Sequence, residues 1–180
     1  MLIKNITILK QVLVVFAAAG VLSGCGGGAD SNPVPPGAEI DLSMTEYQWE
    51  IAPVADPCII DPNLFHDHLV NIAVTNSAGL PLGDVEVNAA LDLSAATYSG
   101  TPVMALYDDK NGNGAGDDSE LVSGAGQGAY TFRTDEYAGT KALWVRVNLS
   151  CPYSGTLTVF AGAASAVLDI EVIERAEAAE

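Results

Sequence analysis

Apolar and polar residues alternate with a period of two in eight short segments of this chain. In LVNIAVT, for example, Val70, Ile72 and Val74 alternate with Asn71 and Thr75. Successive side chains of a strand point to opposite faces, so each segment predicts a β-strand with one apolar face. The segments are residues 40–51, 69–75, 85–93, 102–108, 129–134, 141–150, 156–162 and 166–174. Strands of this kind need a second sheet to cover their apolar faces, which predicts an all-β sandwich of about seven to nine strands.

The alternation changes phase inside the first segment. One apolar set ends at Met44, and the next begins three residues later at Tyr47. This slip predicts a bulge, such as that of a strand that passes from one sheet to the other.

The first 24 residues have the layout of a secretory signal peptide. Lys4 and Lys10 precede an apolar run over residues 12–22 that is too short to span a bilayer as a mature helix. The run leads into Leu-Ser-Gly-Cys at residues 22–25, which resembles the lipobox of bacterial lipoproteins. The resemblance implies cleavage before Cys25 and lipidation of that cysteine, whose several acyl chains would contribute about 0.8 kcal/mol per buried methylene. The alternative, a buried apolar helix with a chance cysteine, leaves the basic start unexplained.

The lipobox resemblance also indicates a location, and the composition of the residues after Cys25 indicates how the chain divides into domains. Gly26 follows the cysteine in place of the aspartate that retains Gram-negative lipoproteins at the inner membrane, so we expect an outer-membrane lipoprotein facing either the periplasm or the cell surface. Residues 25–38 are rich in glycine and proline and read as the lipidated cysteine with a flexible tether. Residues 39–174 then form one sandwich domain, and residues 175–180 an acidic tail.

The charge of the chain excludes one class of partner. The formal net charge is −16 at pH 7, and only 7 lysines and arginines are present. Binding to a phosphate backbone needs a basic surface, so we expect no nucleic-acid partner. The membrane, through Cys25, and an unidentified protein or glycan are the partners that remain.

Three cysteines are present, and Cys25 is assigned to lipid. Cys58 and Cys151 are then the pair available for a disulfide in an exported, oxidising setting, with two buried free thiols as the alternative.

The sequence predicts no enzyme, because it contains no pattern that would bring a nucleophile and a base together. There is no CxxC spacing and no Gly-x-Ser-x-Gly turn, and only two histidines occur.

Two stretches, VTNSAGLPLGDVEVNAAL and TFRTDEYAGTKALWVRV, resemble the bacterial immunoglobulin-like domains of invasin and intimin-type adhesins. The resemblance covers roughly residues 67–173 and implies an immunoglobulin-like β-sandwich. This chain departs from that family in having one domain on a lipid and an inserted acidic loop. The matching turn positions are Asn76, Gly79, Pro81, Thr134, Asp135 and Gly139.

The acidic loop, DKNGNGAGDDSE at residues 109–120, fits the EF-hand pattern D-x-[DN]-x-[DN]-G-x5-E at every position. Calcium prefers six to eight oxygen ligands, which such a loop supplies from alternate positions. Gly116 stands where paired EF-hands have a branched apolar residue, and the flanks are strand-like, so we expect a structural Ca²⁺ loop on a β scaffold. The alternative is a solvated hairpin without an ion. The predicted ligands are Asp109, Asn111, Asn113, the carbonyl of Ala115, Asp117 and Glu120.

Two further groups have less definite interpretations. His66 and His68 share one side of an extended chain, which suits the start of a zinc or copper site or simply a polar strand start; the sequence supplies no third ligand. Trp144 and Tyr130 are candidates for an exposed aromatic site or for covering the sandwich.

Together these features predict a lipid-anchored module that acts without catalysis in adhesion, protein binding or surface assembly. The alternative is an accessory lipoprotein that binds a carbohydrate or other ligand for a partner enzyme or transporter. A small hydrolase is a weaker third hypothesis, because no nucleophile and base come together.

Overall fold

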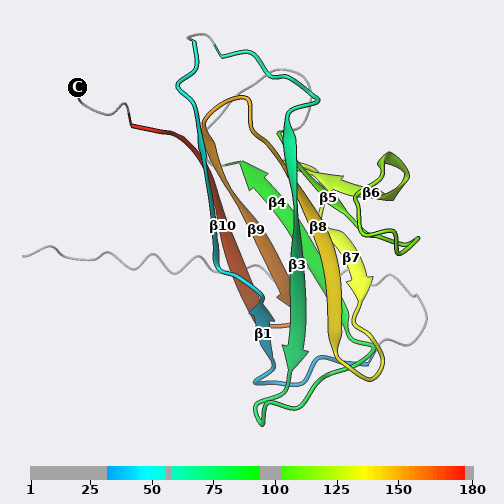
Figure 1. Ribbon diagram of the computed structural model, residues 1–180. Helices are drawn as coiled ribbons and strands as arrows, with labels where there is room; N and C mark the ends of the chain where they lie inside the picture. The colour runs from blue at the N-terminus through cyan, green and yellow to red at the C-terminus, as the bar shows by residue number, and fades with distance from the viewer. Residues whose placement is uncertain (1–31, 56–57, 94–102, 177–180) are drawn as a thin grey trace, which may run out of the picture.

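The computed structural model describes residues 32–55, 58–93 and 103–176, and these residues form ten β-strands and one short 3-10 turn (Figure 1). The predicted signal peptide, Cys25 and the first part of the tether lie outside the described residues, as do residues 177–180 of the tail. No helix in the described part is long and apolar enough to cross a membrane.

The strands form two five-stranded sheets. One contains, in spatial order, β1 (Glu39–Leu42), β3 (Phe65–Thr75), β8 (Thr140–Asn148), β5 (Met104–Tyr107) and β6 (Leu121–Gly124). The other contains β2 (Glu46–Ile51), β10 (Ala164–Glu174), β9 (Tyr153–Ala161), β4 (Glu86–Leu93) and β7 (Tyr130–Arg133). Neighbouring strands are antiparallel, except that β2 runs parallel to β10.

This topology confirms the predicted fold class, an immunoglobulin-like β-sandwich. The order β1-β3-β8-β5 corresponds to the A-B-E-D sheet of immunoglobulin domains, and β10-β9-β4 to the opposite G-F-C sheet. The described residues contain more strands than the sequence predicts for two reasons. The first predicted strand divides into two, and β6 pairs with β5 as an additional strand.

The division of the first strand is the predicted passage between sheets. β1 pairs with β3, in the register Leu42↔Ile72, whereas β2 pairs with β10 in the other sheet. The turn between them carries the chain across the edge of the sandwich, which explains why the apolar phase slips after Met44.

The core lies between the sheets and consists of the apolar faces that the alternation predicts. Val70, Ile72, Leu143, Leu157 and Ile170 are among its fully buried members. Full burial of such a side chain contributes about 1.5–3 kcal/mol, so the interdigitated core supplies most of the driving force for folding.

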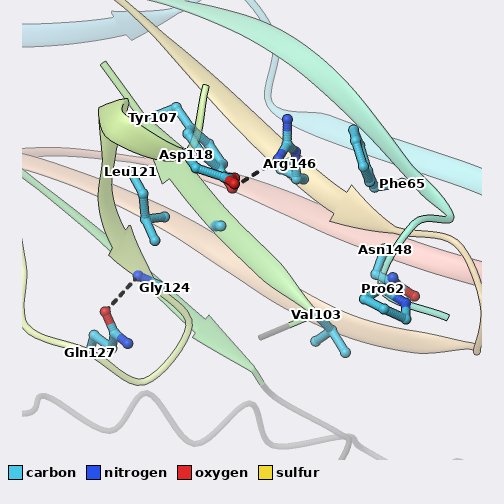
Figure 2. Close-up of a pocket in the computed structure, with 11 residues that line it drawn as sticks. Pro62, Phe65, Val103, Tyr107, Asp118, Leu121, Gly124, Gln127, Arg146 and Asn148 are labelled. Carbon is cyan, nitrogen blue, oxygen red and sulfur yellow. Dashed lines mark hydrogen bonds between the residues drawn. The ribbon is translucent and has the colours of Figure 1, made fainter. Parts of the chain in front are cut away.

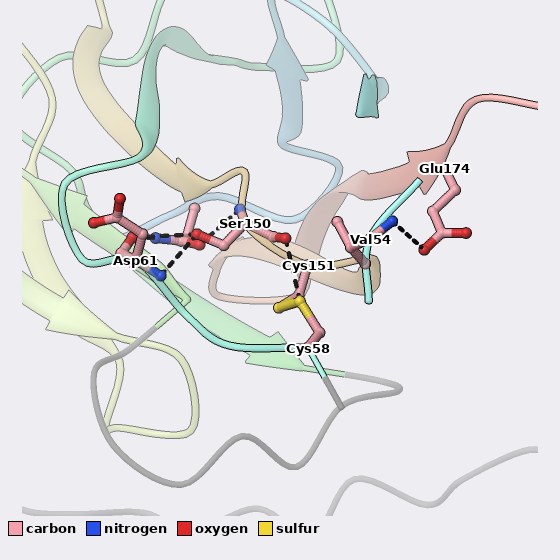
Figure 3. The surroundings of a disulfide bond; sticks show 7 residues. Val54, Cys58, Asp61, Ser150, Cys151 and Glu174 are labelled. Carbon is pink, nitrogen blue, oxygen red and sulfur yellow. Dashed lines mark hydrogen bonds between the residues drawn. A yellow bond between two sulfur atoms is a disulfide. The ribbon is translucent and has the colours of Figure 1, made fainter. Parts of the chain in front are cut away.

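A disulfide joins Cys58, which precedes β3, to Cys151, which follows β8 (Figure 3). The two Cα atoms lie 5.9 Å apart and are separated by 93 residues in sequence. The predicted pairing is therefore confirmed, and the alternative of two free thiols is wrong. Two hydrogen bonds hold Asp61 near the disulfide. The backbone N–H of Asp61 donates to Ser150 Oγ at 2.9 Å, and Asn148 Nδ2 donates to the backbone carbonyl of Asp61 at 2.7 Å. The segment between Cys58 and β3 is therefore held by hydrogen bonds as well as by the disulfide.

We predict that Cys58→Ala/Cys151→Ala lowers the free energy of unfolding by roughly 2–5 kcal/mol, because a long loop is no longer closed in the unfolded chain. Urea denaturation followed by tryptophan fluorescence measures the change. Reduction of the native protein should have the same effect and should leave the double variant unaffected. An unchanged midpoint would mean that the hydrogen bonds around Asp61 hold this connection without the disulfide.

Candidate metal site in the β5–β6 connection

The acidic loop connects β5 to β6 and ends in the 3-10 turn Asp118–Glu120. The backbone N–H of Asp108 donates to the carbonyl of Glu120 at 3.0 Å and closes the base of the loop. The flanks are thus the two strands of a β-hairpin, as the sequence indicates, and the helix pair of an EF-hand sensor is absent from this part of the structure.

The carboxylate of Asp109 organises the first half of the loop. Its Oδ1 accepts hydrogen bonds from the backbone N–H groups of Gly112 at 2.7 Å and Asn113 at 3.1 Å, and its Oδ2 accepts one from Gly114 at 2.9 Å. Gly112 and Gly114 have φ of 71° and 79°. Residues with a Cβ are strained in this left-handed region, so glycine at these positions lets the chain wrap around the carboxylate.

Two further predicted ligands, Asn111 and Asn113, meet at the carboxylate of a third, Asp117. Asn111 Nδ2 and Asn113 Nδ2 both donate to Asp117 Oδ2, at 3.0 and 2.8 Å. The Oδ1 atoms of the two asparagines accept backbone N–H groups two residues further on, at 2.8 Å from Asn113 and 3.0 Å from Ala115. Each asparagine side chain therefore stabilises the turn through Oδ1 and directs Nδ2 toward the carboxylate of Asp117.

Glu120 joins the two halves of the loop. Its side chain is buried, with 3% of the residue exposed. Oε1 accepts the N–H of Asn111 at 3.0 Å, and Oε2 accepts the N–H of Asp117 at 3.3 Å. A buried carboxylate at the last position of the loop is what the EF-hand pattern requires for a bidentate ligand.

The donor set fits calcium in its chemistry. Asp109, Asp117 and Glu120 offer carboxylate oxygens, the two asparagines offer amide oxygens, and Ala115 offers a carbonyl; all are hard donors of the kind that Ca²⁺ prefers. Binding would require each asparagine amide to rotate so that Oδ1 faces the ion, and the second lone pair of that oxygen can keep the backbone hydrogen bond. In the described residues, no three His, Cys, Asp or Glu side chains are gathered closely enough to form a metal cluster, so the carboxylates would also move inward.

Arg146 on β8 attaches the far side of the loop to the sheet. Its Nη2 donates to the carbonyl of Gly116 at 2.7 Å, and its Nε and Nη2 form a two-pronged ion pair with Asp67 at 2.7 and 2.8 Å. Nη1 donates to the hydroxyl of Tyr107 at 3.0 Å. The guanidinium carbon lies 3.9 Å from the ring centre of Phe65 and 4.5 Å from that of Tyr107, so the cation also stacks on two aromatic faces.

This attachment explains the glycine at position 116. A Cβ on Gly116 would lie 2.8 Å from Cγ of Tyr107, closer than side chains pack. Where a paired EF-hand uses a branched apolar residue to reach its partner loop, this loop lies directly on the ring of Tyr107.

A second attachment precedes the loop at Asp108, of which 5% is exposed. Its carboxylate pairs with Lys141 at 2.6 Å and accepts a hydrogen bond of 2.6 Å from the hydroxyl of Tyr130. Burial by itself would raise the pKa of Asp108, but the hydrogen bonds from Lys141 and Tyr130 outweigh it and lower that pKa below the ordinary value. Burial, together with the charge of Asp108, raises the pKa of Tyr130.

The residues that attach the loop to the sheet are therefore not among the predicted calcium ligands. Asp67, Tyr107, Lys141 and Arg146 come from three different strands, and no local pattern links them to the loop. One signal does exist in the sequence. Lysine and arginine number only 7 in a chain with 23 acidic residues, so each cation on a strand next to an acidic insertion is a candidate partner.

A cavity of about 220 Å³ opens beside the loop on the outer face of the first sheet (Figure 2). Phe65, Tyr107 and Leu121 give it apolar walls, and Arg146, Gln127 and Asp118 line it with polar groups.

Trp144 and Tyr130 do not form the exposed aromatic pair considered from the sequence. Trp144 lies opposite Tyr107 in the first sheet, whereas Tyr130 belongs to β7 in the second sheet and stacks on Phe132.

No protein-family model matches this chain, and no curated protein matches it. Solved structures with a similar fold include a PapD-like domain of human CEP192, with 8% identity and a TM-score of 0.36 over 87% of this chain and 98% of that one. Domains 4 and 5 of the S-layer protein SbsC give 15% identity and a TM-score of 0.39 over 80% and 48% of the two chains. The CupB6 tip adhesin from Pseudomonas aeruginosa gives 11% identity and a TM-score of 0.39 over 96% and 56%. At these values the likeness carries no conclusion about activity or partner.

We predict that Asp108→Asn lowers the free energy of unfolding by about 1–3 kcal/mol at pH 7 in calcium-free buffer, because charge-assisted hydrogen bonds are lost in a buried place. The pKa of Asp108 is lower in the folded protein than in the unfolded chain. Its contribution to the free energy of unfolding is therefore complete when the pH is above the pKa of the unfolded chain, and it is lost as the pH falls through the pKa of the folded protein. The difference between the variant and the native protein should therefore shrink below about pH 4. Denaturant midpoints measured from pH 7 to pH 3 test this, with the exposed Asp92→Asn as the matched control; a difference that does not change with pH would contradict it.

Proposed function

We propose that this chain is a lipid-anchored module of the bacterial cell envelope, in which an immunoglobulin-like sandwich is stiffened by a structural Ca²⁺ ion in the loop of residues 109–120. It acts without catalysis, in adhesion, protein binding or surface assembly. The observation that carries the proposal is the convergence of Asp109, Asn111, Asn113, Asp117 and Glu120 into one hydrogen-bonded loop on a β-hairpin.

Two further observations support the cellular setting. The disulfide between Cys58 and Cys151 suits an oxidising compartment outside the cytoplasm. The sequence of residues 1–25 resembles a lipoprotein signal, and the expected outer-membrane location rests on Gly26. Lipid on Cys25 would hold the sandwich at a membrane surface.

Calcium in this loop would be structural. When bound, the ion neutralises the carboxylates of Asp109, Asp117 and Glu120, which otherwise repel one another. Because Gly116 is already tied to Arg146, a stiffened loop would in turn fix the wall of the adjoining cavity.

The cavity favours a second candidate function, the binding of a carbohydrate or another small ligand for a partner enzyme or transporter. Its aromatic walls and few polar groups are of the kind that ligand sites use. Retention of the protein on immobilised glycans, lost in Phe65→Ala, would favour this candidate; capture of a protein partner without glycan binding would favour the first.

We predict that calcium titrated into the chelator-treated protein binds at one site with a Kd of about 0.1–1 mM, as in other extracellular calcium modules. At ten to a hundred times the Kd, the ion should stabilise the fold by roughly 1.4–2.7 kcal/mol and raise the melting temperature by several degrees. Isothermal calorimetry and thermal denaturation measure both effects. Glu120→Gln should abolish them because it removes one oxygen of the closing ligand, whereas Glu39→Gln on the exposed edge of β1 should change neither. Full calcium binding by Glu120→Gln would contradict the assignment.

A further inference from the structure

A second group of metal-ligating side chains lies at the seam between the two sheets, away from the acidic loop. β1 pairs with β3 only from Ile72 to Thr75, so the first half of β3 has no strand beside it on that edge. There β3 faces β2, which belongs to the opposite sheet. On β3, His66 and His68 lie on the same face of the strand as the buried Val70. On β2, Tyr47 and Trp49 lie on the same face as the buried Ile51. All four rings therefore turn inward across the seam.

The four rings form one cluster. The ring centres of His66 and His68 lie 6.4 Å apart, and that of Tyr47 lies 6.3 Å from His66 and 5.0 Å from His68. Trp49 packs 4.6 Å from His66 at an angle of 31° and restricts the orientation of that imidazole. Two imidazoles that bind one ion through nitrogen at about 2.0–2.1 Å have ring centres roughly 5–6.5 Å apart, so the observed separation is already within reach of a shared ion.

One polar atom of this cluster lacks a partner in the described residues. The hydroxyl of Tyr47 is the one buried side-chain polar atom of the described residues that forms no hydrogen bond. An unpaired buried hydroxyl is costly, and a bound group would satisfy it.

We propose that His66, His68 and Tyr47 form a binding site for a divalent transition cation of the Cu²⁺ or Zn²⁺ type. The two imidazoles are the first ligands, the hydroxyl of Tyr47 is assigned as a third donor because its ring packs against both imidazoles, and water completes the coordination. Nitrogen donors select such borderline ions, whereas the all-oxygen loop of residues 109–120 selects Ca²⁺. Of the first-row divalent ions, Cu²⁺ binds most tightly to a site of this composition.

The chain contains only two histidines, which makes the site directly observable. The protein is titrated with Zn²⁺ or Cu²⁺ in the presence of millimolar Ca²⁺, which keeps the acidic loop occupied or masked. Imidazole resonances are followed by NMR for Zn²⁺, and nitrogen hyperfine coupling by electron paramagnetic resonance for Cu²⁺. The proposal predicts that one equivalent of ion perturbs both imidazoles at once.

Matched variants assign the ligands. His66→Asn and His68→Asn should each weaken binding at least tenfold by calorimetry, and Tyr47→Phe should weaken it less while changing the copper spectrum. Glu120→Gln should leave Zn²⁺ and Cu²⁺ binding unchanged, and His68→Asn should leave the calcium response unchanged, which also shows that the variant is folded. Imidazole signals that do not move in the native protein, or binding that survives in both histidine variants, would overturn the proposal and leave the four rings as inter-sheet packing.

Discussion

The packing of two apolar sheet faces against each other determines where the polar clusters of the described residues lie. Leu106 on β5, Val70 on β3 and Val145 on β8 occupy the interior, so their neighbours along each strand must point outward. In the resulting register, Arg146 lies opposite Asp67 on one side and Ala105 on the other. The core thereby brings Asp67, Arg146 and Tyr107 together on the outer face, and the acidic loop attaches there.

The short stretch His66-Asp67-His68 illustrates this dependence. Asp67 points outward and holds Arg146, which in turn holds the carbonyl of Gly116 in the loop. The two histidines point inward, where β1 has left the sheet edge and Tyr47 and Trp49 approach from β2. One three-residue segment thus contributes to two polar clusters of different chemistry, on opposite faces of the same strand.

Most of the fold could be predicted from the sequence, because strand alternation is a local signal. The phase slip after Met44 correctly indicated the change of sheet, and the oxidising context correctly paired Cys58 with Cys151. The strand β6 was indicated only as a strand-like flank of the acidic loop and was absent from the eight alternating segments, because it is short and becomes a strand by pairing with β5. Asn148 has the same phase along β8 as the outward-facing Arg146, yet it is buried, and its amide donates to the carbonyl of Asp61, which lies 87 residues away, so local alternation does not show this burial. The attachment of the loop through Arg146 could not be predicted either, since it depends on a register between strands far apart in sequence. The ligand pattern within the loop is local and stays a prediction, as does the lipid on Cys25.

The proposal of a calcium site rests most heavily on a loop that hydrogen bonds to Asp109 already organise in the absence of an ion, and amide hydrogen exchange by NMR tests this organisation directly. The amides of Gly112, Asn113 and Gly114 are bonded to Asp109, so they should exchange slowly in chelator and more slowly still in millimolar calcium, while the amides of the core strands β3 and β8 do not change. Rapid exchange of these three amides that calcium does not slow would contradict the account and show that residues 109–120 are a solvated hairpin.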